Sequence, residues 1–258
     1  MPSREETNSV DHKLKSVFRI LLACGALSSA CLTLGMPAAH ADDFIVYSPY
    51  VVQGQSEFEF RGHSYRDSDA SISGSYEYLF SFAHAFTDWW KPEIYFADYQ
   101  RSPGGPQYFK TREFENTFQL TSTGEYWADV GFLASYEYKV QAGNPNVLEF
   151  GPLLEKRTGR FVHRLNLIWE KQIGGGADRK YEFRGAYSLS YAWKQAFAPG
   201  VELYYRPGDD ARQIGPVFYG ELASNRGNEL EYSAGVVFGA NRGAPDQTLV
   251  LRLEYEFF

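Results

Sequence analysis

Charged and apolar side chains alternate along several stretches of this 258-residue sequence. In one stretch Glu57, Glu59 and Arg61 alternate with Phe58 and Phe60. Because successive side chains of a β-strand point to opposite faces, one face of such a strand is charged and the other is apolar. A face of carboxylates and guanidinium groups can form a packed network of ion pairs. It can also line a hydrated passage, as rings of Asp and Glu do in cation pores.

The same alternation continues along most of the chain and places many charged residues on one common face. We predict that this face lines an interior, and its members are Glu57, Glu59, Arg61, Glu77, Glu93, Glu113, Glu115, Asp129, Glu137, Arg164, Glu170, Glu182, Arg184, Glu202, Arg206, Glu221, Glu231, Arg252 and Glu254. Acidic residues outnumber basic ones, which favours cationic or neutral solutes if the interior is hydrated. Tyr95, Tyr99, Tyr204 and Tyr219 share the predicted face and either stack solutes or fill space. A packed network and a hydrated channel both remain open.

The residues that could catalyse a reaction or bind a metal are few. After residue 41 the histidines are His63, His84 and His163, and there is no cysteine. A serine hydrolase needs a histidine, a serine nucleophile and an orienting third group, and the neighbours of these histidines do not supply that pattern. Three scattered histidines also make a poor metal site. We therefore predict no catalytic residue, no metal and no cofactor.

The first 41 residues have the pattern of a secretory signal peptide. A basic start (Lys13, Lys15, Arg19) precedes a mostly apolar stretch over residues 17–36, and Ala39-His40-Ala41 places small residues at the cleavage site. The alternative is a transmembrane helical anchor. The expected domains are a signal peptide over residues 1–41 and a mature domain over residues 42–258. Residues 1–41 carry four basic and three acidic groups of the 25 and 32 in the chain, which leaves 21 and 29 and argues against binding nucleic acid.

The mature part shows no helical period. An extended lead-in over residues 42–54 is followed by twelve expected strands, at about 55–65, 71–85, 89–99, 111–121, 127–140, 147–155, 161–172, 181–193, 200–206, 213–222, 229–240 and 249–257. Their lengths suit a tilted membrane crossing, whereas the strands of a soluble sandwich are usually shorter. The predicted fold is all-β, a transmembrane antiparallel up-and-down barrel of about twelve strands. Its last strand should pair with the first, near residues 56–65, so that no edge stays open.

These features carry a resemblance to a known group. The signal peptide, the alternating aromatic strands and two turns, Phe86-Thr-Asp-Trp89 and Phe197-Ala-Pro-Gly200, resemble those of small transporter-like outer-membrane barrels of Gram-negative bacteria, notably the meta-pathway phenol-degradation proteins. The resemblance implies export through the periplasm, contact with outer-membrane lipid and porin-like passage of small solutes. It also implies that the barrel-assembly machinery recognises the last strand, which ends in Phe257-Phe258. In such barrels the last residue is an aromatic whose neighbours two, four and six positions earlier are apolar. Here Phe257, one residue before the end, has that pattern of neighbours.

Two other hypotheses stay beside the channel. One is a non-conducting structural or surface-interaction barrel, although short external loops argue against an adhesin. The other is a lipid-modifying outer-membrane enzyme, which the absence of a histidine motif disfavours.

Overall fold

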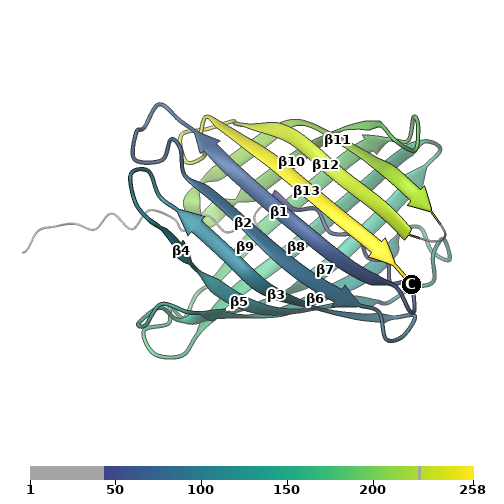
Figure 1. Ribbon diagram of the computed structural model, residues 1–258, viewed down its shortest axis with the longest axis horizontal. Coiled ribbons are helices and arrows are strands. Elements are labelled where there is room, and N and C mark those ends of the chain that lie inside the picture. The colour runs from purple at the N-terminus through teal and green to yellow at the C-terminus, as the bar shows by residue number, and fades with distance from the viewer. Residues whose placement is uncertain (1–43, 226–227) are drawn as a thin grey trace, which may run out of the picture. The chain divides into compact units, whose positions relative to one another are not determined.

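The computed structural model describes residues 44–225 and 228–258, which belong to one compact unit (Figure 1). Residues 1–41, the expected signal peptide, lie outside the described residues. The strands are β1 (Ser56–Arg66), β2 (Tyr76–His84), β3 (Trp90–Arg101), β4 (Gln107–Phe109), β5 (Thr111–Gln119), β6 (Asp129–Lys139), β7 (Asn146–Thr158), β8 (Phe161–Ile173), β9 (Tyr181–Tyr191), β10 (Ala198–Arg206), β11 (Ala211–Asn225), β12 (Asn228–Gly239) and β13 (Gln247–Phe257). A short 3-10 helix, η2 (Pro207–Asp209), follows β10. No helix in the described part of the chain is long and apolar enough to span a membrane.

The strands close into an antiparallel barrel of twelve strands, as predicted. β4 and β5 count as one strand, because both pair with β3 in a single register, from Trp90 opposite Phe118 to Arg101 opposite Gln107. β1 pairs with β13 along its whole length, from Ser56 opposite Phe257 to Arg66 opposite Gln247. β2 pairs with β3, which completes the ring. The predicted pairing of the last strand with the first is therefore confirmed, and Figure 1 shows β13 in yellow beside β1.

The two faces of the barrel differ as the alternation predicts. Large apolar side chains are exposed on the outside along most strands; examples are Phe58, Ile94, Phe114, Leu203, Ile214 and Leu251. Exposed aromatic residues flank this surface, with Trp89, Trp127 and Trp193 near one end and Tyr138 and Tyr181 near the other. An apolar band between two aromatic girdles is the exterior of a transmembrane barrel. We call the end where β1 begins and β13 finishes the terminal end, and the opposite one the far end.

Two local features differ from the sequence predictions. The second strand begins at Tyr76, because Asp69 accepts backbone hydrogen bonds from Ile72 and Ser73 in a turn, and Gly74 adopts a positive φ. A β-bulge in β3 shifts its pairing with β2 between Phe80 and Ser81, and a bulge moves the later side chains to the opposite face. The prediction that Tyr99 points inward was wrong for this reason, and Asp98 is buried instead.

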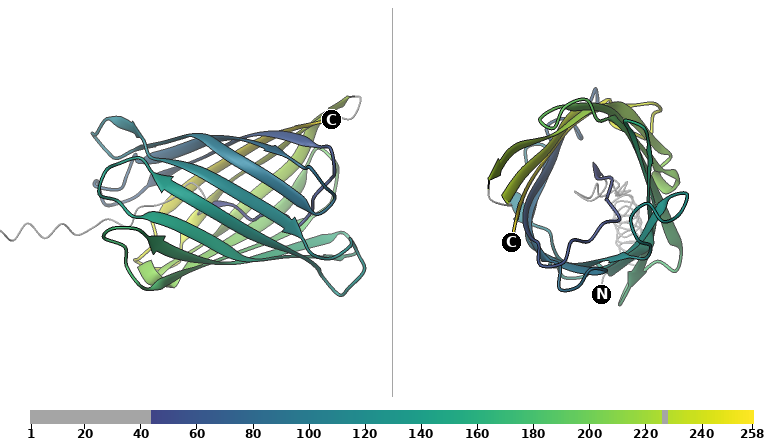
Figure 2. Two further views of the ribbon diagram at one scale, coloured as in Figure 1. Left: turned by 90° about the horizontal axis from the view of Figure 1, so that it is seen from below. Right: turned by 90° about the vertical axis from the view of Figure 1, so that its right-hand side faces the viewer.

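The lead-in before β1 runs inside the barrel. Ile45, Val46, Tyr47 and Val51 are buried, although residues 46–52 form no strand. The end-on view shows this segment, in dark purple, within the ring of strands (Figure 2). We call residues 44–55 the N-terminal segment. The sequence predicted its extended form and did not predict its place in the lumen.

Close strand packing at Gly151 generates a test of the fold. A Cβ at Gly151 would lie 1.9 Å from the Leu167 carbonyl oxygen, where β7 passes β8 beside Pro152. Because backbone atoms cannot move aside cheaply, we expect Gly151→Ala to destabilise the barrel by about 1–3 kcal/mol, the usual cost of overpacking. Urea unfolding, followed by heat-modifiable gel migration, measures this. Gly175→Ala is the matched control, because nothing lies within 4 Å of its Cβ position; equal stability of the two variants would contradict the packing.

Candidate functional site

The N-terminal segment crosses the lumen and contacts both walls. Ile45 and Tyr47 pack in one apolar cluster with Leu133, Leu153 and Ile168 of β6, β7 and β8. Val46, between them, packs in a second cluster with Ala186, Tyr204, Val217, Val237 and Val250 of β9 to β13. Alternate side chains of an extended chain point in opposite directions, so one short segment holds both walls. The barrel therefore has an apolar layer inside its charged lumen.

Polar contacts fix the position of the segment. The side-chain amide of Asn166, which is 1% exposed, accepts a hydrogen bond from the Tyr47 N–H (2.6 Å) and donates one to the Tyr47 carbonyl (3.1 Å). The Tyr50 hydroxyl donates to Asp129 (2.6 Å). Burial, followed by this hydrogen bond, raises the pKa of the Tyr50 phenol, which keeps it protonated as the donor. The Pro49 ring fits against β6 because the residue that faces it is Gly131.

A square of four charges lies at the seam between β1 and β13. The register sets Arg61 opposite Arg252 and Glu59 opposite Glu254. Like charges directly opposite each other destabilise a sheet. Here Glu59 accepts from Arg61 at 2.7 Å and pairs with Arg252 at 3.2 Å, and Arg252 also reaches Glu254 at 2.5 Å. The Glu59 carboxylate, which is 5% exposed, therefore bridges both arginines, and Glu254 supplies the second negative charge.

Two inward lysines belong to the same lumen network, of which Lys91 is partly exposed and Lys110 is buried. Lys91 pairs with Glu57 at 2.7 Å and Lys110 pairs with Glu77 at 2.6 Å. Sequence reasoning missed both. Lys91 shares the parity of Glu93 and was recognisable by that signal. Lys110 lies at the break between β4 and β5, where a strand assignment by alternation gives no inward position.

Arginines neutralise the carboxylates on the opposite wall. Arg184 contacts Glu149 at 2.7 Å and Glu170 at 3.4 Å, and Arg206 contacts Glu170 at 2.8 Å. These charge-assisted bonds link β9 with β7 and β8, and link β10 with β8. Most of the lumen charge is thus paired within the protein.

The structure places the predicted interior residues in three groups. Those that are buried are Glu57, Glu59, Arg61, Glu77, Glu93, Glu113, Glu115, Asp129, Glu137, Glu170, Arg184, Glu202 and Glu254. Those that are partly exposed are Arg164, Arg206, Glu221 and Arg252. Glu182 and Glu231 are exposed, Glu182 at the far end of β9 and Glu231 beside a cavity. Of the predicted interior tyrosines, Tyr95 and Tyr204 are buried.

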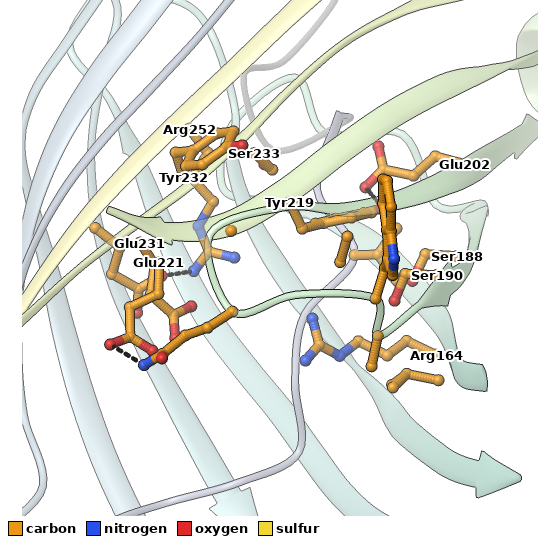
Figure 3. Close-up of a pocket in the computed structure, with 18 of the residues that line it drawn as sticks. Arg164, Ser188, Ser190, Glu202, Tyr219, Glu221, Glu231, Tyr232, Ser233 and Arg252 are labelled. Atoms are coloured by element: carbon orange, nitrogen blue, oxygen red, sulfur yellow. Dashed lines mark hydrogen bonds and ion pairs between the residues drawn. The ribbon is translucent and has the colours of Figure 1, made fainter. Parts of the chain in front are cut away.

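A cavity of about 430 Å³ lies between the N-terminal segment and strands β8 to β13 (Figure 3). Phe44 and Val46 form part of its inner wall, and the turn at Trp193–Gln195 borders it at the terminal end. Its charged lining is balanced, with Glu202, Glu221, Glu231 and Glu254 against Arg157, Arg164, Lys194 and Arg252. The cavity differs in this respect from the acidic lumen as a whole.

The described residues offer limited chemistry for catalysis or metal binding. His63 is buried with neither ring nitrogen hydrogen-bonded within the described part of the chain. His84 Nδ1 and Ser56 Oγ lie 2.9 Å apart, and no acidic or amide group orients this pair among the described residues. Carboxylate oxygens of Glu57, Glu254 and Glu256 lie within 4.8 Å of one another. Lys91 and Arg252 already neutralise two of these three groups, so the cluster assigns no metal.

Comparisons with known proteins give the fold. No family model and no curated protein matches the sequence. Among solved structures, the NanC porin superposes with a TM-score of 0.50 at 11% identity, covering 78% of this chain and 99% of that one. An outer-membrane channel from Pseudomonas putida F1 superposes with a TM-score of 0.55 at 12% identity, covering 80% and 95%. The predicted resemblance to small outer-membrane barrels is confirmed at the level of the fold.

The charge square generates a stability test. Glu59→Gln leaves Arg61 and Arg252 opposite each other without their shared carboxylate. We expect a loss of about 3 kcal/mol, the low end for a broken buried pair, because the Arg252 side chain is 26% exposed. Urea unfolding at neutral pH measures it. The exposed Glu125→Gln is the control, and a Glu59→Gln barrel as stable as that control would remove the role given to Glu59.

Proposed function

We propose that this protein is a porin-like channel of the outer membrane for passive passage of small solutes. The observation that carries the proposal is a closed barrel with an apolar exterior around a lumen of charged side chains. An arginine or lysine facing lipid would cost about 2–4 kcal/mol near the bilayer midplane, and Asp and Glu are also unfavourable there, so the charged face must be the interior. The solved channels with this fold support the proposal by analogy.

We also propose how the chain reaches this location. Residues 1–41 direct export and are removed, and residues 42–258 form the mature barrel. The barrel-assembly machinery binds the last strand, where Phe257 pairs with Ser56 and Phe258 extends beyond the seam with 70% of its surface exposed. In this proposal the machinery recognises Phe257 as the terminal aromatic residue of the assembly signal. Lipid contacts the outer face of the assembled barrel.

The electrostatics of the lumen favour cationic and neutral solutes. Glutamates face glutamates across several strand pairs, such as Glu93 opposite Glu115 and Glu113 opposite Glu137. Acidic side chains at close quarters raise the local concentration of cations and repel anions.

The N-terminal segment sets the width of the route. Its residues fill the apolar layer at Val217, Val237 and Leu133, in the middle of the strands. Solutes therefore pass around the segment or require it to move. This arrangement also favours the second candidate function, a non-conducting structural barrel, in which the segment stays fixed.

Conductance tests the channel directly. In planar bilayers we expect the purified mature protein to give discrete steps, and a salt gradient to give a reversal potential of the sign for cation preference, because carboxylates dominate the lumen. Complete silence across the voltage range would contradict the channel. A preference for anions would contradict the electrostatic part alone.

A paired substitution tests the role of the segment. Val46 is 5% exposed inside an apolar cluster, whereas Val52 on the same segment is 48% exposed. An aspartate at position 46 would be buried without a partner, which costs more than about 2 kcal/mol. The population in which the N-terminal segment is packed against the lumen wall then falls more than about tenfold relative to the displaced one. We expect Val46→Asp to raise single-channel conductance.

Val52→Asp is the matched control, because it introduces the same charge at an exposed position of the same segment. We expect it to conduct like the wild type. Silence of the wild type and of Val46→Asp would favour the non-conducting barrel, and equal conductance of all three proteins would show that the segment does not limit passage.

A further inference from the structure

The cavity at the terminal end has a pair of carboxylates on one side and the Arg164 guanidinium group on the other. Glu221 and Glu231 are directly opposite on β11 and β12, and lie side by side in Figure 3. Arg164, on β8, lies on the other side of the view. All three line the cavity. A ligand between them meets the two carboxylates at one end, with Arg252 beside them, and the Arg164 guanidinium group at the other.

The charged groups on these two sides of the cavity retain hydrogen-bond donors and acceptors for a ligand. Arg164 uses its Nε to contact Glu155 at 2.7 Å, and its side chain is 28% exposed. A guanidinium has five N–H donors, so Arg164 retains donors for a carboxylate. Glu221 uses Oε1 to accept from Gln195 at 2.7 Å and retains its second oxygen. Glu231 is exposed and lies directly opposite Glu221 on β11 and Glu254 on β13.

The remaining lining suits a small polar molecule. Ser188, Ser190 and Ser233 supply hydroxyls, and Tyr219 and Tyr232 supply aromatic surface. A volume of about 430 Å³ lies in the range of small-molecule sites, about 300–1,000 Å³. The lining contains four carboxylates and four cationic side chains, so a ligand with net charge of either sign gains less than one with both charges.

We propose that this cavity binds a small zwitterion, with its carboxylate at Arg164 and its ammonium group at Glu221 and Glu231. This proposal rests on the proposed channel function and extends it, because it assigns a binding site for one class of solute beside the N-terminal segment. The site lies on the inner face of β8, β11 and β12.

Titration calorimetry on the mature protein in detergent tests the site. The probes are alanyl-alanine, its N-acetyl form, which lacks the ammonium group, and its C-terminal amide, which lacks the carboxylate. We expect the free dipeptide to bind at least about tenfold more tightly than either blocked form, because each loses one charge-assisted contact. Equal binding of all three, or no binding of the free dipeptide at millimolar concentration, would overturn the proposal.

Two variants assign the ends of the ligand. Arg164→Gln should weaken the free dipeptide about tenfold and leave its amide unaffected, whereas Glu231→Gln should weaken the free dipeptide and leave the N-acetyl form unaffected. Arg179→Gln and Glu125→Gln, at exposed positions outside the cavity, should change nothing. Heat-modifiable migration checks that every variant is folded. The opposite assignment, or equal effects of the control variants, would refute the site.

The outcomes separate this inference from the proposed function. A barrel that conducts but does not discriminate among the three ligands keeps the channel and loses the zwitterion site. A barrel that never conducts but discriminates as expected keeps the site and loses the channel.

Discussion

Neutralisation of buried carboxylates inside the barrel is the constraint on which the rest of this structure depends. Closing twelve strands removes every edge and satisfies the backbone, but it also encloses a face that carries many charged side chains. An unpaired buried charge costs several kcal/mol, and removing one partner leaves the other unpaired. Glu59 illustrates the solution, because it holds two arginines that the register would otherwise set against each other. Lys91 and Lys110 each pair with one carboxylate, that of Glu57 and that of Glu77.

The apolar layer within the charged lumen follows a different logic. Inward residues such as Leu133 and Val217 would contact water in an empty barrel, and the N-terminal segment covers them. Burial of a valine or leucine side chain contributes about 1.5–3 kcal/mol, so a few contacts hold a short segment in place. A segment held by a few contacts is also one that a single buried charge can displace. The same segment bounds the cavity whose balanced charges distinguish it from the acidic lumen.

Most of the fold could be predicted from the alternation of apolar and polar residues in the sequence. Period-two patterning gave the strands, their faces and the pairing of the last strand with the first, because one face must be apolar in a membrane. It failed where the period breaks. The bulge in β3 turned Tyr99 outward and Asp98 inward, and Lys110 lay at a strand break. The position of residues 44–55 in the lumen could not be predicted either, because a segment without a periodic pattern does not indicate which residues it packs against.

Crosslinking in the membrane tests the central claim, that the N-terminal segment occupies the lumen. The sequence after residue 41 contains no cysteine, so a pair introduced at Val46 and Val217, which pack in one cluster, reports on that contact alone. In isolated outer membranes we expect a short thiol crosslinker to join Val46→Cys to Val217→Cys, and an impermeant thiol reagent to label Val52→Cys much faster than Val46→Cys. No crosslink, with equally rapid labelling at both positions, would contradict the account.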